Sequence, residues 1–183
     1  VKTPTAKWLG SSEINQEFQS FLHVRLFRGI EGVLIDKMKR CLEIFEKKKV
    51  SLTSNPKTDI IIDLPPAYTK PDHIPLIEKR IKKFNQRNET QLSLQVGDEV
   101  KLRIPHQDFV SLFLDPIIKQ NMIEIRGIIE DLLQQEPSLK RILFVGGFSD
   151  CYPFCHQLQE LANEKGLFLL RSLTKSSMVV VQG

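Results

Sequence analysis

The chain has 183 residues, 41% of them hydrophobic and 26% charged, a composition typical of a globular protein with a sizeable core. Its uninterrupted apolar runs, such as 60–62 and 178–181, are far too short to cross a bilayer or to form the core of a secretory signal. Three cysteines, an odd number without a disulfide framework, favour a reducing compartment, so we expect an intracellular, cytoplasmic protein. The net charge of +4 is interleaved with acidic residues almost everywhere and indicates little about partners.

The first half of the chain predicts an alternation of helices with short strands. A helix that Ser11 or Ser12 can cap carries apolar residues at helical spacing until Gly29 interrupts it. The predicted helices cover about 11–26, 31–52 and 74–84, and the predicted strands cover 59–64, 91–96 and 99–104. The last two strands alternate apolar and polar residues and are joined around Gly97 and Asp98, which predicts a hairpin.

From Pro105 onward the pattern indicates a different organisation. A short helix around Phe109 is followed by a helix that begins at Asp115 and Pro116 and runs to about residue 135. Strand 141–145, helix 153–165 with Gly166 as its C-cap, and strand 167–171 then form a βαβ unit with parallel strands. We therefore expect an α+β subdomain over 9–104 and an α/β subdomain over 105–183, whose sheet is too small to be complete.

The segment after the strand 141–145 is the one that most resembles a ligand-binding loop. Gly146 and Gly147 lack a Cβ, so the backbone there can turn sharply and approach a ligand closely. The N-terminus of the following helix offers partial positive charge to a phosphate. A nucleotide is therefore the first ligand to consider, although ordinary α/β connections use the same turn.

Three motifs then occur in a recognisable order: Trp8-Leu9-Gly10 leading to Asn15, Phe45-Glu46-Lys47-Lys48-Lys49, and Val145-Gly146-Gly147-Phe148-Ser149. From about Trp8 to the end, the chain resembles the second lobe of the actin-like, ribonuclease H-like ATPase domain of the seventy-kilodalton heat-shock chaperones. It looks most like the divergent branch called heat shock 70 kDa protein 12, forms A and B. The resemblance implies that 9–104 is the IIB-like subdomain and 105–183 an incomplete IIA-like one.

The resemblance also implies an adenosine site with two walls. One wall is the end of the second helix, whose polar positions fall on one stripe beside the buried face at ~100° per residue; a solvated helix edge has the same pattern. The other wall is the glycine turn, which lies against the sugar and the α-phosphate. The implied nucleotide-binding residues are Glu46, Lys49, Thr53, Gly146, Gly147, Phe148, Ser149, Gly10 and Ser177.

Two departures from the family weaken the expected activity. Val50 and Asp150 stand where the well-known chaperones hold adenine between two arginines, so planar cation stacking on the base is lost. Phe148 either offers an aromatic face instead or plugs the core. The phosphate-binding loops, and most of the magnesium site, belong to a first lobe that precedes the matched region, so we expect ATP or ADP to bind without hydrolysis by this chain alone.

Other groups in the sequence favour chemistry less. Cys151, Cys155 and His156 do not have zinc-site spacing, and adjacent helical residues cannot act as a Cys–His pair. Asp59 and Asp63 are expected to be solvated ends of a strand.

A non-catalytic interaction module remains the alternative function. It would keep the fold without the nucleotide and present the basic stretch 79–83 to an acidic protein partner, such as a co-chaperone. Solvated helix faces are the favoured interpretation of 47–49 and 79–83. Nucleic-acid binding ranks below both, because aromatic residues are not interleaved with the basic ones.

Overall fold

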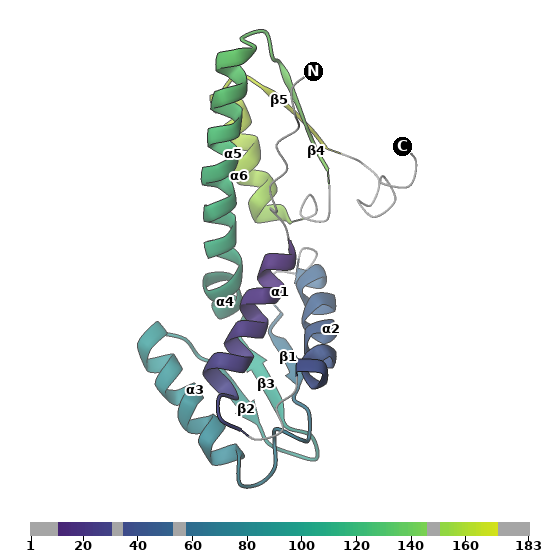
Figure 1. Cartoon of the computed structure of the whole chain (residues 1–183), viewed down its shortest axis with the longest axis vertical. Helices are drawn as coiled ribbons and strands as arrows, with labels where there is room; N and C mark the ends of the chain where they lie inside the picture. Colours follow the sequence, from purple (N-terminus) through teal and green to yellow (C-terminus); the bar gives the residue numbers. More distant parts are fainter. Residues whose placement is uncertain (1–10, 31–34, 53–57, 146–150, 172–183) are drawn as a thin grey trace. The chain divides into compact units, whose positions relative to one another are not determined.

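The computed structural model describes residues 11–30, 35–52, 58–145 and 151–171. Its two compact units are Ile14–Asp115 and Pro116–Gly183 with Val1–Glu13, which we call the 14–115 unit and the 116–183 unit. The first elements are α1 (Ser11–Ser20), η1 (Phe21–Leu26), α2 (Ile35–Leu52), β1 (Ile60–Asp63), α3 (Ile74–Asn88), β2 (Ser93–Gln95), β3 (Lys101–Ile104), α4 (His106–Phe109) and η2 (Val110–Leu114). They are followed by α5 (Asp115–Gln135), β4 (Arg141–Phe144), α6 (Tyr152–Glu164) and β5 (Phe168–Arg171) (Figure 1). The expected mixed α/β class is confirmed.

The sheet of the 14–115 unit is antiparallel, with the strand order β1-β3-β2. The predicted hairpin is confirmed, since β2 pairs with β3 in a register that sets Leu94 opposite Leu102. β1 pairs on the other side of β3, where Ile62 lies opposite Leu102. Alternate residues of β1 and β3 are buried, so one face of the sheet points into the core.

Aromatic rings fill the core between α1, α2 and η2. Phe18 and Phe45 stack with ring centroids 3.9 Å apart and planes 6° apart. Phe113 meets Phe18 edge-on at 5.7 Å. Rings of this size contribute large buried areas and prefer such stacked and edge-on pairs, so they fix α1 against α2.

Two helices of this unit continue into wider, π-helical turns. η1 extends α1 and η2 extends α4, where the sequence pattern predicts α-helix only. The rings of Phe21 in η1 and Phe113 in η2 meet edge-on, with centroids 5.6 Å apart. Gly29, with φ +72°, follows η1 in the left-handed region, which agrees with its predicted role as an interruption.

The 116–183 unit contains the predicted βαβ unit. β4 and β5 are parallel, with Leu143 opposite Leu170. Gly166 has φ +68°, and the amide of Leu167 donates to the carbonyl of Ala162 at 2.8 Å, which closes the α6 C-terminus as a Schellman motif. The predicted parallel strands and glycine C-cap are both confirmed.

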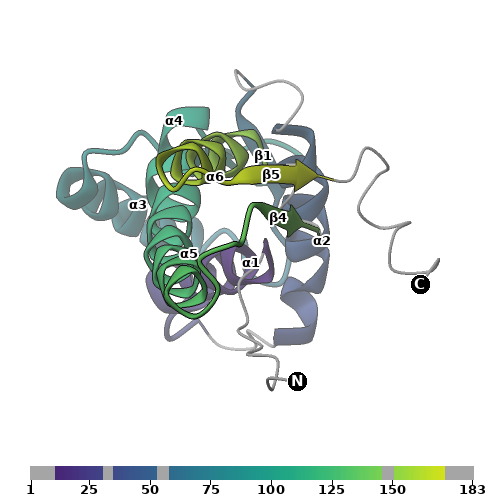
Figure 2. The same cartoon turned by 90° about the horizontal axis from the view of Figure 1, so that it is seen from above.

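The two faces of the β4–β5 pair are covered differently. In both views α5 and α6 lie on the same side of the strands (Figure 1 and Figure 2). Phe144 faces that side and contacts Phe154 with ring centroids 5.4 Å apart. The opposite face carries Leu143 and Phe168, which are 67% and 68% exposed, so no part of the chain that the structure describes covers it.

The structure bears on the expected subdomain boundary and on the expectation that the chain does not cross a membrane. The subdomain boundary expected at Pro105 falls inside the 14–115 unit, and the division into two subdomains stays a prediction. Among the described helices, none is both long enough and apolar enough to cross a membrane.

Candidate functional site

The structure describes two of the residues that the resemblance implies for the adenosine site, Glu46 and Lys49, both in the last two turns of α2. The other seven implied residues lie outside the described residues: Thr53, Gly146, Gly147, Phe148, Ser149, Gly10 and Ser177.

Glu46 and Lys49 form a closed polar network with Asn15 of α1. The Lys49 ammonium donates to Glu46 Oε2 at 2.6 Å and to Asn15 Oδ1 at 2.9 Å. The Asn15 amide in turn donates from Nδ2 to the same Glu46 oxygen. Each of the three side chains therefore contacts the other two, and the network joins two helices.

The network has a buried end and an open end. Lys49 is only 8% exposed, whereas the Glu46 side chain is 41% exposed. The expectation that 47–49 is a solvated basic face is therefore wrong for Lys49, although Lys47 and Lys48 are exposed. A buried ammonium requires partners, because removing its water costs several kcal/mol unless hydrogen bonds and opposite charge replace it.

Packing of α1 on α2 places Asn15 next to this pair. Phe18 lies one turn after Asn15 and stacks on Phe45, the residue before Glu46. The stacked rings thus fix the two helices where their polar edges meet.

Asn15 is a site residue that sequence reasoning missed. It appeared only within the first motif of the resemblance, 31 residues from Glu46. The available signal was its position between the apolar residues Ile14 and Phe18, at the border of the buried stripe of α1. Its contact with α2 required the folded arrangement.

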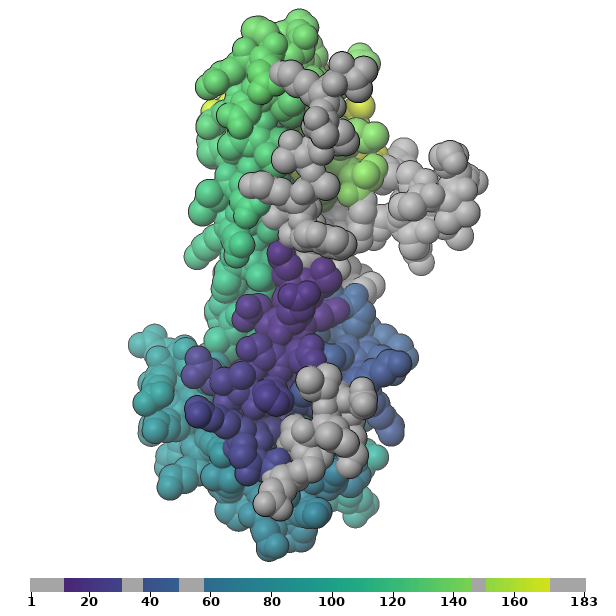
Figure 3. Space-filling view, in the orientation of Figure 1, coloured from purple at the N-terminus to yellow at the C-terminus, as the bar shows by residue number. Residues whose placement is uncertain are grey.

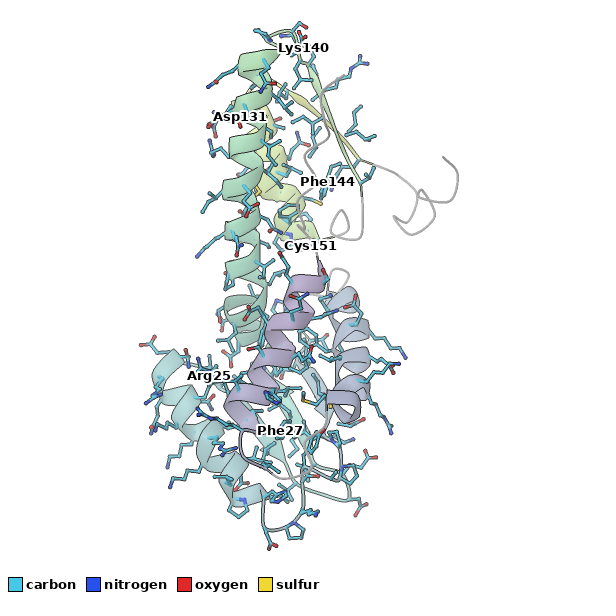
Figure 4. The ribbon with its side chains drawn as sticks, in the orientation of Figure 1. Arg25, Phe27, Asp131, Lys140, Phe144 and Cys151 are labelled. Carbon is cyan, nitrogen blue, oxygen red and sulfur yellow. The ribbon has the colours of Figure 1, made fainter. Side chains whose placement is uncertain are left out.

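The second predicted wall is described only at its borders. β4 ends at Phe144 and α6 begins at Tyr152, with Cys151 extended at the N-cap (φ −79°, ψ 100°). Figure 4 shows Phe144 and Cys151, which flank the glycine segment. The strand before the turn and the helix after it are confirmed. The turn itself lies outside the described residues.

Asp59 has a different role from the one expected. Its carboxylate accepts hydrogen bonds from Arg103 Nε at 2.8 Å and from the His106 amide at 3.2 Å. The Arg103 Nη2 atom lies 2.5 Å from the same carboxylate. The expectation of a solvated strand end is wrong for Asp59, because it links the start of β1 to the end of β3 and to α4.

The buried thiol of Cys41 is unsuited to nucleophilic chemistry. Burial raises the pKa of Cys41 from 9.0 to about 11, and the negative charge of Asp63 adds to the shift. Its Sγ donates to the Asp63 carbonyl at 3.4 Å. The protonated thiol is a weak nucleophile, so Cys41 has a packing role at neutral pH.

The part of the chain that the structure describes contains no candidate metal site. No group of three or more His, Cys, Asp or Glu side chains is placed there to hold an ion. Cys151 and Cys155 are buried.

No family model, curated protein or solved structure matches the chain. The resemblance to the heat-shock chaperone ATPase lobe therefore rests on its three motifs and stays a prediction.

Proposed function

We propose that this chain is an adenine-nucleotide-binding lobe of an actin-like ATPase of the heat-shock-70 type, from an intracellular, cytoplasmic protein. It contributes the adenosine side of a cleft. The phosphate-binding loops and most of the magnesium site belong to a separate first lobe, so the chain binds ATP or ADP and does not hydrolyse ATP by itself.

The observation that carries the proposal is the network of Asn15, Glu46 and Lys49. A lysine on a solvated helix edge would be exposed to water, whereas Lys49 is 8% exposed and hydrogen-bonded to two side chains. Ionisable groups that are both buried and specifically paired concentrate at binding sites, although structural ion pairs share these features. Two of the three residues are those that the resemblance assigns to adenosine.

The geometry suits recognition of a hydroxyl-bearing ligand by Glu46. A carboxylate that is 41% exposed can accept hydrogen bonds from a ligand, while Lys49 and Asn15 hold one of its oxygens in place. The cation itself is buried behind the carboxylate and is poorly placed to attract a phosphate. With Val50 and Asp150 in place of stacking arginines, we expect little discrimination between ATP and GTP.

Calorimetric titration of ATP, ADP and GTP into the full chain tests the proposal. We expect Glu46→Gln to weaken binding of all three nucleotides by about tenfold, the effect of one charge-assisted hydrogen bond. Lys47→Met, at an exposed neighbouring position, is the matched control and should bind like the wild type.

The same titration is repeated on the chain joined to its upstream coding sequence, since one wall of a cleft binds weakly. Absence of nucleotide binding in both proteins would overturn the proposed function.

One observation favours the second candidate, a non-catalytic interaction module. Lys79, Lys82 and Lys83 are exposed on α3, which is coloured teal in Figure 3. Arg80 does not belong to this surface, because it is half-buried and donates to the Leu26 carbonyl at 2.7 Å. Of the basic stretch 79–83, the three lysines are therefore the residues available to an acidic protein partner.

Charge reversal tests this candidate without disturbing Arg80. A variant with Lys79→Glu, Lys82→Glu and Lys83→Glu should keep the far-ultraviolet circular dichroism of the wild type and lose binding to a polyglutamate-coated surface at about 0.15 M salt. Lys39→Glu with Lys47→Glu and Lys48→Glu, at exposed positions of α2, changes the net charge equally and is the control. Equal loss in both variants would show a general charge effect and exclude a specific α3 surface.

A further inference from the structure

A groove of about 500 Å³ runs between α5 and α6 in the 116–183 unit. Its lining residues come from these two helices only: Met122, Ile123, Arg126, Gln157, Glu160, Leu161 and Glu164. Ile123 is 74% exposed, more than any other exposed large hydrophobic residue described. The groove therefore offers an exposed apolar side chain that another molecule can contact.

Ion pairs hold the two helices that form the groove. Arg126 of α5 donates to both carboxylate oxygens of Glu164 of α6, at 2.8 and 3.0 Å. Lys165, which follows α6, donates to Glu130 of α5 at 2.7 Å. These ion pairs bridge α5 and α6 beside the groove, and as exposed pairs each adds little to stability.

Gly127 opens the surface of α5 beside the groove. It lies one turn after Ile123, near the middle of a 21-residue helix. A Cβ at this position would meet none of the described residues within 4 Å, so their packing does not require glycine. Glycine weakens a helix interior, and its lack of a side chain lets another backbone approach closely.

The charge of the groove indicates the sign of its partner. The lining contains one cation, Arg126, and two carboxylates, Glu160 and Glu164. Arg126 is engaged by Glu164, and the ion pair described for Glu160 is with exposed His156 at 3.5 Å, which is charged only when protonated. Glu160 is thus the groove carboxylate best placed to pair with a cation from outside.

We propose that this groove binds an amphipathic helix of a partner protein, with an apolar side chain over Ile123 and Gly127 and a lysine or arginine beside Glu160. Helix-in-groove recognition combines an apolar contact with a polar rim in this way. The proposal is independent of nucleotide binding, because it uses none of the predicted adenosine residues.

Two stapled helical peptides serve as probes in the test. One is built from Leu, Ala and Lys, and the other replaces each Lys by Glu. Fluorescence anisotropy should show that the full chain binds the Lys peptide at least about threefold more tightly than the Glu peptide, the effect of one exposed ion pair. Glu160→Lys should reverse this preference.

Substitutions of the apolar contact locate the binding surface. Ile123→Asp should weaken the Lys peptide about tenfold or more, because it removes a central apolar contact. Gly127→Gln should also weaken it, by filling the open surface of α5. Leu132→Asp, 45% exposed and on the opposite side of α5, is the control and should bind like the wild type.

Several results would overturn the proposal. No binding of the Lys peptide to the wild type excludes this kind of partner, and binding that survives Ile123→Asp places the contact elsewhere. If light scattering shows that the wild type self-associates without binding either peptide, and Ile123→Asp abolishes the association, the occupant is a second copy of the chain and the proposed partner is wrong.

Discussion

The two units of this protein close their apolar surfaces to different degrees. In the 14–115 unit, the rings of Phe18, Phe45 and Phe109 are at most 1% exposed. In the 116–183 unit, Leu143 and Phe168 stand on one sheet face and remain about two-thirds exposed. The same kind of residue is thus a core component in one unit and a surface component in the other.

Sheet type explains the difference. In β1, exposed Ile61 lies between buried Ile60 and Ile62, so the antiparallel sheet needs only one covered face. The parallel strands β4 and β5 each contain three consecutive apolar residues, the pattern of strands covered on both faces. A two-stranded pair is also marginal by itself. Most of the stability of the described chain should therefore come from the 14–115 unit, whereas the open apolar surfaces belong to the 116–183 unit.

Removing one aromatic ring from each unit tests this difference most strongly. Phe18→Ala should destabilise the 14–115 unit by about 3–5 kcal/mol, because it leaves a cavity in a close-packed ring cluster. Phe168→Ala should change stability by less than about 0.5 kcal/mol, as expected for a surface position. Urea unfolding, followed by hydrogen exchange in α1 and in α6, measures the stability of the two units separately. Similar losses of stability in the two variants would show that the units do not differ in how far their apolar residues are buried.

The closed core should also make stability depend on alkaline pH through Cys41. Its folded pKa of about 11 lies above the ordinary 9.0, so the folded state keeps a proton that the unfolded state releases. The stabilisation is complete below pH 9 and is lost as pH rises towards 11, amounting to about 2–3 kcal/mol. When pH is raised from about 8 to about 10.5, the urea midpoint of the wild type should fall further than that of Cys41→Ala. Parallel curves would show that the thiol is not desolvated.

The polar network of the 14–115 unit should have a smaller effect. Glu46→Ala leaves the buried Lys49 ammonium without its carboxylate, and we expect a loss of about 1–2 kcal/mol, reduced by the partial exposure of Glu46. Lys47→Ala, at an exposed position of the same helix, should cost less than about 0.5 kcal/mol. Chemical denaturation of the two variants checks this, and equal costs would mean that the network does not stabilise the unit.

Two glycines of the 116–183 unit should give the smallest effects, with opposite signs. Gly127→Ala should stabilise by about 0.5–1 kcal/mol, because the site is helical and the added Cβ meets nothing. Gly166→Ala should destabilise by about 1 kcal/mol, since its φ of +68° is unfavourable for a residue with a side chain. Thermal unfolding of both variants decides the matter. A stabilising Gly166→Ala would contradict the assigned cap.

Local patterns in the sequence were sufficient for most of the fold. Apolar spacing predicted the described helices, alternation predicted the hairpin of β2 and β3, and Gly166 marked the end of α6. These features depend on residues close together in the chain. The π-helical turns were missed, because their buried residues Phe21, Leu22 and Leu26 also fit an α-helical stripe.

The candidate site was less accessible to sequence reasoning, for a physical reason. The polar stripe of Glu46 and Lys49 was visible, but whether Lys49 meets water or another helix depends on residues more than 30 positions away. Asn15 and the partners of Asp59 were hidden by the same long separations. Helical phase gives the direction of a side chain relative to its own helix and no information about what lies opposite.

The two π-helical turns bear on how this protein can tolerate changes in chain length. A π-turn spans one residue more than an α-turn, so η1 and η2 each contain a residue that a regular helix would not need. Deleting that residue should restore an unbroken α-helix and keep the flanking residues in phase, whereas a deletion in the regular helix α2 would rotate the following positions by ~100°. The π-helical turns are thus the places in these helices where a one-residue deletion should be tolerated best.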